Sequence, residues 1–245
     1  MVRPLTRHAA GLLLGFSLMS ASAQDGDGPV VKIDGMKNPQ MHSYRAVVKG
    51  LDIFDKLHHL APAVPEVRFY FQMRGDQVAP DEAPVLRIAG DELSRYVPIG
   101  PDGRFSIPRI QQAIDEDAAL IMNRKKNAYR IGPDIRTPGL PADVRRLGDL
   151  RLECQVKIAI AKAEAPFWVV AAGNSVLLTR DWCSIFKGDK ADYDVEAAAP
   201  VSAATMVHGE RKRVLKTEKG KVKVPIAEPD WPDDALIELT FGSEG

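Results

Sequence analysis

The 245-residue chain lacks the short motifs that most readily identify an enzyme. It has no Gly-x-Ser-x-Gly, no His-Glu-x-x-His, no P-loop and no Gly-x-Gly-x-x-Gly pattern. Its five histidines and two cysteines include no Cys-x-x-Cys pair and no cluster with zinc spacing. The sequence therefore favours a non-catalytic protein and implies no cofactor.

A surplus of basic residues is also missing. Lys and Arg total 33, Asp and Glu total 33, and the formal net charge is zero. Nucleic-acid and anionic-membrane binders normally carry a basic face. The densest basic stretch, Arg211–Arg213, is diluted by Glu210 and Glu218, which is typical of a solvated strand face. We expect no nucleic-acid partner.

The N-terminus has the order of a secretory signal peptide. Two arginines precede the apolar stretch Ala9–Met19, and small residues end at Ala23. We predict a signal peptide at 1–23, cleavage between Ala23 and Gln24, and a disordered polar leader at 24–29. No later apolar run is long enough to span a bilayer. The expected location is the periplasm or the exterior of a Gram-negative bacterium.

Export gives the two cysteines, Cys154 and Cys183, a specific meaning. In an oxidising compartment an even pair of cysteines predicts a disulfide. Such a bridge would close a loop of about 30 residues and stabilise the fold by roughly 3–4 kcal/mol. Two buried free thiols are the alternative.

The chain repeats its design once. An offset of 117 positions takes Gly103 to Gly220, Pro108 to Pro225 and Ile114 to Trp231. Upstream, the pattern at 88–91 recurs at 207–210, with the offset two positions longer. This is an internal duplication of a β-rich unit. The alignment with Ile114 makes Trp231 a core position, rather than a surface for stacking sugars.

A tight turn organises the first copy. In Pro101-Asp102-Gly103, proline fixes φ, aspartate accepts backbone hydrogen bonds and glycine allows a positive φ. We predict that Phe105 returns from this turn as the hairpin partner of the strand at 96–99. The second copy has Glu-Lys-Gly there, ending at Gly220.

The alternation of side chains predicts a mainly β fold of two tandem antiparallel β-sandwich units. The clearest strand is Val67–Met73. The expected boundaries are 30–140 for the first unit, 141–190 for a connector and 191–245 for a second, shorter unit. We also predict an extended segment at 44–48 and a short helix near 52–61 capped by Asp52.

The connector is ambiguous between strand and helix. Strict alternation from Leu150 to Ile160 favours a strand within 148–164, although a helix also fits. The apolar connector near 157–179 is open to a helix as well. Its most apolar part, Phe167–Leu178, is too short to cross a membrane, and we expect it to pack between the two units.

The candidate chemical residues are few. Asp55 and His59 are spaced i,i+4, which on a helix places a carboxylate beside an imidazole. With His42 or His208 they would form a metal-binding or metal-dependent hydrolase site. The alternative is an ordinary surface pair.

Two carboxylate clusters precede equivalent strands of the two copies. They could bind calcium or could simply be turn-forming acids. Their members are Asp115, Glu116 and Asp117 in the first copy and Asp230, Asp233 and Asp234 in the second.

The stretch Ile99–Pro108 resembles the Asp-x-x-Gly-x-Phe hairpin of carboxypeptidase-regulatory-like domains, which are transthyretin-like, Ig-like β-sandwiches. It also resembles bacterial exported proteins of unknown function that carry such domains. The resemblance implies a binding or structural module of the cell envelope, with another envelope protein or an extracellular ligand as partner. The metal-dependent hydrolase is the alternative function.

Overall fold

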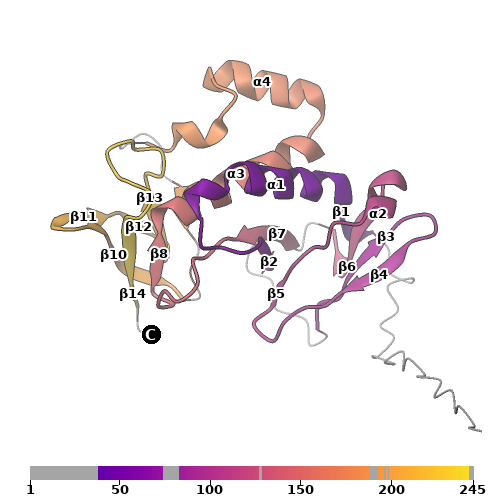
Figure 1. Cartoon of the computed structure of the whole chain (residues 1–245), viewed down its shortest axis with the longest axis horizontal. Helices are drawn as coiled ribbons and strands as arrows, with labels where there is room; N and C mark the ends of the chain where they lie inside the picture. The colour runs from indigo at the N-terminus through magenta and orange to yellow at the C-terminus, as the bar shows by residue number, and fades with distance from the viewer. Residues whose placement is uncertain are drawn as a thin grey trace, which may run out of the picture. The chain divides into compact units, whose positions relative to one another are not determined.

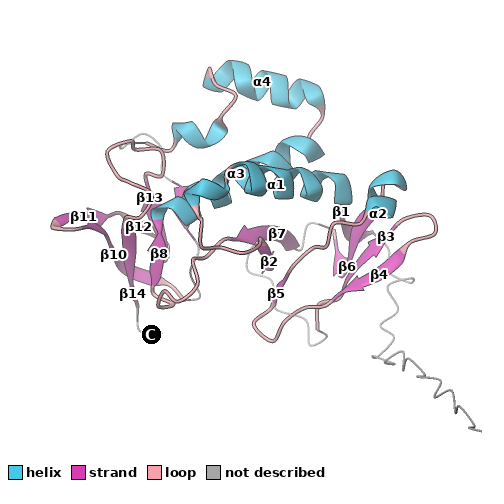
Figure 2. Cartoon of the chain, viewed as in Figure 1, coloured by secondary structure: helices cyan, strands magenta, loops and turns pink. Residues whose placement is uncertain are grey.

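The computed structural model describes residues 38–73, 83–126, 129–187, 193–195, 197 and 199–242. These residues form a mainly β structure with antiparallel sheets and a few helices (Figure 1 and Figure 2). The predicted signal peptide, its cleavage site at Ala23 and Gln24, and the leader lie outside the described residues. Among the described helices, none has the length and apolar character that a bilayer crossing requires.

The first repeat places one long helix between its first strand and the remaining strands. Its final strand, β7, ends at Asp134. The elements are β1 (Pro39–Ser43), α1 (Tyr44–Lys56), η2 (His58–Leu60), β2 (Arg68–Met73), β3 (Leu86–Ala89), β4 (Ser94–Val97), β5 (Arg104–Phe105), α2 (Gln111–Asp115), β6 (Ala119–Lys125) and β7 (Tyr129–Asp134).

The second repeat begins earlier than predicted. Strand β8 pairs with β14, so part of the expected 141–190 connector belongs to the second repeat's own sheet. The elements are β8 (Val144–Arg146), α3 (Leu147–Glu164), α4 (Phe167–Leu177), η3 (Trp182–Ile185), β9 (Tyr193–Val195), β10 (Val201–His208), β11 (Arg211–Leu215), β12 (Thr217–Glu218), β13 (Lys221–Val224) and β14 (Leu236–Phe241).

The larger sheets of the two repeats have the same strand order. The first is β4-β3-β6-β1 and the second is β11-β10-β14-β8. In each sheet, the first strand of a hairpin (β3 or β10) pairs with the strand that comes last in the chain (β6 or β14). That strand pairs in turn with the strand that precedes the long helix (β1 or β8). The amide of Tyr44, the first residue of α1, donates to Ala118 O at 3.1 Å, and that of Leu147, the first of α3, donates to Ala235 O at 2.8 Å. The two carbonyls are 117 positions apart, as the sequence repeat predicts.

The smaller sheets also correspond. Phe105 of β5 pairs with β2, and Val222 of β13, 117 positions on, pairs with β9. The preceding glycines, Gly103 and Gly220, have φ of +71° and +72°. The predicted hairpin partner is wrong, however, because β4 pairs with β3 and β5 with β2. The upstream strands are equivalent at an offset of 118 positions, not 119. Ile88 faces Leu120 in the first repeat, and Met206 faces Ile237 in the second, so that Ile88 and Met206 occupy equivalent positions.

The helix expected at 52–61 lies earlier in the chain. Ser43 caps α1 by accepting a hydrogen bond from Ala46 N at 3.3 Å, so the segment predicted as extended is the first part of the helix. The helix ends at Lys56, before the short η2 turn. Its buried positions recur every three or four residues, the helical spacing: Tyr44, Val47, Val48, Leu51 and Phe54.

The strand favoured within 148–164 is also wrong, because α3 is a helix that packs against two cores. Leu152 and Val156 belong to the first core, and Leu150 and Cys154 to the second. Positions two residues apart on a helix lie about 200° apart, on opposite sides. Burial on both sides therefore produces the strict alternation that is typical of a strand.

Helices α1 and α3 lie side by side and antiparallel (Figure 1). Near one end His42 contacts Glu164, and near the other Arg146 donates to Leu60 O. Between these ends the helices approach closely at Gly50. A Cβ built at Gly50 would lie 2.6 Å from Ile160 Cγ1, so a larger residue cannot be accommodated without movement.

We predict that Gly50→Leu lowers the free energy of unfolding by about 1–3 kcal/mol, because overpacking forces the two helices apart. The measurement is the midpoint of urea unfolding. The control is Lys49→Leu, at a neighbouring position whose side chain is 69% exposed. A Gly50→Leu protein as stable as the control would contradict the close packing of α1 and α3.

Candidate functional site

Helix α4 is an apolar helix with no buried residue. Phe167 is 85% exposed, Trp168 64% and Val176 80%, and Leu178 just after the helix is 90% exposed. Single exposed apolar residues are common on protein surfaces, but four within one short segment make α4 a candidate interaction surface. The prediction that Phe167–Leu178 packs between the units is therefore wrong. The segment faces solvent, and the long helices α1 and α3 fill the position expected for it.

The inner side of α4 rests on Trp182 of η3. A Cβ at Gly173 would lie 2.4 Å from Trp182 Cζ2, so the glycine permits this close approach. Trp182 Nε1 donates to Asn174 Oδ1 at 2.9 Å, and the Lys162 ammonium lies 4.5 Å from the centre of the indole ring. Trp182 thus links α4 to α3 through packing, a hydrogen bond and a cation–π contact.

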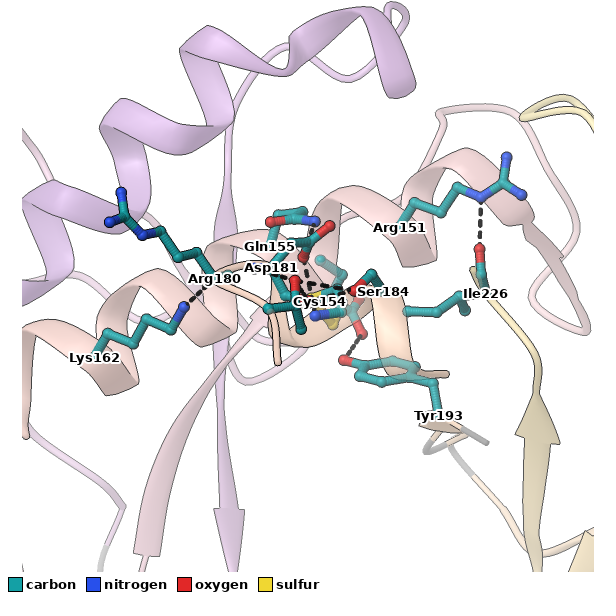
Figure 3. Close-up of a disulfide and its surroundings, with 12 residues drawn as sticks. Arg151, Cys154, Gln155, Lys162, Arg180, Asp181, Ser184, Tyr193 and Ile226 are labelled. Carbon is teal, nitrogen blue, oxygen red and sulfur yellow. Dashed lines mark hydrogen bonds between the residues drawn. A yellow bond between two sulfur atoms is a disulfide. The ribbon is translucent and has the colours of Figure 1, made fainter. Parts of the chain in front are cut away.

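A disulfide joins η3, in the segment that follows α4, to helix α3. Cys154 and Cys183 are bonded, with Cα atoms 6.1 Å apart, which confirms the predicted bridge. Beside it, Asp181 accepts from Cys183 N at 3.0 Å and from Gln155 Nε2 at 2.9 Å (Figure 3). The segment that follows α4 is therefore fixed to α3, and at its other end α4 follows α3 after only Ala165 and Pro166.

A second feature is a network of buried charges where the repeats meet, which we call the inter-repeat charge network. Asp134, the last residue of β7, binds the guanidinium groups of Arg104 and Arg136. Glu153 of α3 accepts from Arg145 at 2.9 Å, and from the Tyr193 hydroxyl at 3.3 Å. The network is completed by Asp149, which accepts from the amide of Thr137 at 2.7 Å and from its hydroxyl at 2.8 Å.

The network shifts the protonation of its members. Burial alone would raise the pKa of Asp134, but the charges and hydrogen bonds of Arg136 and Arg104 outweigh it, so that the pKa lies below its usual range. Burial raises the pKa of Tyr193, which keeps its hydroxyl protonated as a hydrogen-bond donor. Near neutral pH, Asp134 is therefore a carboxylate that only accepts hydrogen bonds.

The sequence-predicted pair of Asp55 and His59 is not assembled. Helix α1 ends between them, and the Asp55 carboxylate binds Arg109 at 2.6 Å. His42 instead contacts Glu164 at 2.9 Å, and His208 lies 3.4 Å from Asp234. Within the part of the chain that the structure describes, no group of three His, Cys, Asp or Glu side chains is placed to hold a metal ion.

The carboxylate clusters make contacts within the protein. Glu116 accepts from the amides of Glu92 and Leu93 at 3.1 and 3.0 Å, which fastens the turn between β3 and β4. Asp233 binds Arg151. These contacts match the turn-forming role that the sequence left open beside calcium binding.

Sequence reasoning missed both α4 as a surface and the inter-repeat charge network. The spacing of Asp149 and Glu153 was the available signal, since i,i+4 carboxylates share a face only on a helix. That signal was lost when 148–164 was interpreted as a strand. Trp231, by contrast, is buried as predicted, with 1% exposed.

We predict that replacing both cysteines, Cys154→Ser with Cys183→Ser, lowers the free energy of unfolding by about 3 kcal/mol through the loss of loop closure. Urea unfolding with and without reductant measures the change. Reductant should destabilise the original protein and leave the double variant unaffected. Two titratable thiols in the unfolded, unreduced protein would show that the bridge does not form.

Acid should weaken the charge network through Asp134. A carboxyl group whose pKa is lowered on folding stabilises the protein above its unfolded pKa and loses that contribution as the pH falls through the folded value. We therefore expect the stability gap between the original protein and Asp134→Asn to be largest above about pH 4, the usual pKa of an unfolded aspartate, and to narrow as the pH falls below it. Denaturation across this range measures it, with the exposed Asp55→Asn as control. Parallel profiles for the original protein and Asp134→Asn would contradict the prediction.

Comparison with known proteins returns no match: no protein-family model, no curated protein and no solved structure matches the chain. The resemblance to carboxypeptidase-regulatory-like domains therefore stays a prediction.

Proposed function

We propose that the chain is a non-catalytic binding module of a bacterial cell envelope, which docks another envelope protein through helix α4. The observation that carries the proposal is that α4 has no buried residue although its exposed face is apolar. A helix that is apolar on its outer side normally has a cover. The disulfide and Trp182 hold α4 in place before binding, which lowers the entropic cost of docking.

The charges beside α4 favour a protein partner over an anionic membrane. Glu164 precedes the helix, and Arg180 and Asp181 follow it, so the border carries both signs. Helices that bind anionic lipid surfaces carry a basic surplus. An apolar centre with a charged border is instead the usual anatomy of a protein interface.

The location and the finer fold belong to the same proposal. The order of the N-terminal sequence and the Cys154–Cys183 bridge support an oxidising compartment such as the periplasm. The matching strand orders of the two repeats support a pair of tandem units, which we propose to be transthyretin-like sandwiches on the resemblance of the stretch Ile99–Pro108. N-terminal sequencing of the exported protein tests the location and should begin at Gln24.

Site-specific photo-crosslinking in the native envelope tests the docking surface. A photoreactive residue at Val176 should give a discrete protein adduct, which Trp168→Asp abolishes. Val214 on β11 is the matched control, because it is also a valine with 80% of its surface exposed. Equal adducts at both positions, adducts with lipid only, or no adduct at Val176 would overturn the proposal.

With the crosslinked partner purified, we predict that Trp168→Ser weakens its binding at least about tenfold, since buried aromatic residues dominate interface energies. Isothermal titration calorimetry measures the affinity. Val214→Ser should bind like the original protein. The unfolding midpoint of Trp168→Ser should not change, because the side chain is 64% exposed.

A further inference from the structure

A cavity of about 520 Å³ lies between the smaller sheets of the two repeats. Both repeats contribute to its lining, the first through β2, β5 and β7 and the second through α3, β9 and β13. Its volume is that of a small-molecule site rather than of a packing defect. Its lining is rich in charged groups from both repeats.

Among the described residues that line this cavity, basic side chains outnumber acidic ones. The basic ones are Arg104, Arg130, Arg136, Arg145, Lys157 and Lys221, and the acidic ones are Asp102, Asp134, Glu153 and Asp194.

The acidic groups are already neutralised, in part by cations that do not line the cavity. Arg68 binds Asp102 at 2.8 Å, and Lys223 binds Asp194 at 2.5 Å. Neither Arg130 nor Lys157 makes an ion pair with another described residue. The cavity therefore holds positive charge that no described carboxylate balances.

Arg145 contributes an unsatisfied donor at the same place. Its side chain is 3% exposed, and one terminal nitrogen donates to Glu153 at 2.9 Å and to Ile135 O at 3.2 Å. Its Nε is buried without a hydrogen-bond partner. Because Nε has no accessible surface, a ligand in the cavity would meet Arg145 through its charge rather than through this donor.

The duplication supplies this cavity with equivalent cations. Arg104 follows Gly103 and Lys221 follows Gly220, at the shared offset of 117 positions and with the same left-handed turn before each. Both side chains line the cavity. The two repeats thus direct corresponding basic residues towards one volume.

We propose that this cavity binds a small organic dianion whose charged oxygens belong to phosphate or carboxylate groups. Guanidinium groups match the geometry of both kinds of oxyanion, and two negative charges would balance Arg130 and Lys157, which no described carboxylate pairs. Phe71 and the ring of Tyr193 provide apolar wall for the body of the ligand. The site is separate from α4 and does not depend on the proposed docking function.

Calorimetric titration of the intact, disulfide-bonded protein tests the proposal. The probes are glucose 6-phosphate and succinate, with glucose and acetate as neutral and singly charged controls. At least one dianion should bind, and both controls should bind at least tenfold more weakly. The phosphate and dicarboxylate probes show which oxyanion is preferred. No dianion binding, or equal binding of acetate, would overturn the proposal.

Charge-removing variants locate the binding. Arg130→Gln and Lys157→Gln should each weaken dianion binding about five- to tenfold. Arg130→Gln should leave the unfolding midpoint unchanged, because Arg130 makes no ion pair with a described residue, whereas Lys157→Gln also removes a cation–π contact with Tyr193. Lys212→Gln, on the exposed face of β11, removes the same charge elsewhere and should have no effect. Trp168→Ser should bind the dianion normally, which separates this test from that of α4. Equal affinity in all the variants would place the binding outside the cavity and contradict the proposal.

Discussion

The packing of α3 on three sides is the constraint on which the rest of the structure depends. One side contacts α1 and the first core, the opposite side contacts the second core, and a third faces the loop after β7 and the cavity. Each fully buried aliphatic side chain contributes about 1.5–3 kcal/mol, so two apolar stripes bind the repeats strongly. The third stripe carries carboxylates, which are tolerated at this depth because Arg145 and Thr137 satisfy them. The members of the three stripes are Leu152, Val156 and Ile160; Leu150, Cys154 and Ile158; and Asp149, Glu153 and Lys157.

Part of the β structure could be predicted from the sequence, because β2, β3 and the first half of β6 alternate between buried and less buried positions. The duplication was visible for the same reason, since equivalent strands bury equivalent positions. Helix α3 could not be recognised, because burial on opposite sides gives a helix the period of a strand. Strand pairing could not be predicted from the sequence either. The turn at Gly103 specifies a reversal of the chain, but it does not specify which sheet the next strand joins.

Features of the candidate site that depend on covalent or local chemistry could be predicted from the sequence. Features that depend on tertiary packing could not. The bridge between Cys154 and Cys183 follows from an even cysteine count in a chain that is predicted to be exported. The exposure of Phe167 could not be foreseen, because an apolar run has the same sequence whether it lies inside a protein or on its surface. The pairing of Asp134 with Arg104 joins residues of different strands, so neither residue is distinctive by itself.

The cavity and helix α4 arise from opposite properties of the duplication. The cavity comes from what the repeats share, since Arg104 and Lys221 occupy equivalent positions and meet in one place. Helix α4 comes from what they do not share. In the first repeat, residues 57–67 lead from the long helix to the next strand, whereas in the second the corresponding link is 165–192 and contains α4 and η3. Because the first repeat completes its sheets with the short link, the fold does not require α4. An exposed apolar addition that the fold does not need, followed by a disulfide-bonded segment, is what led us to propose an interaction outside the chain.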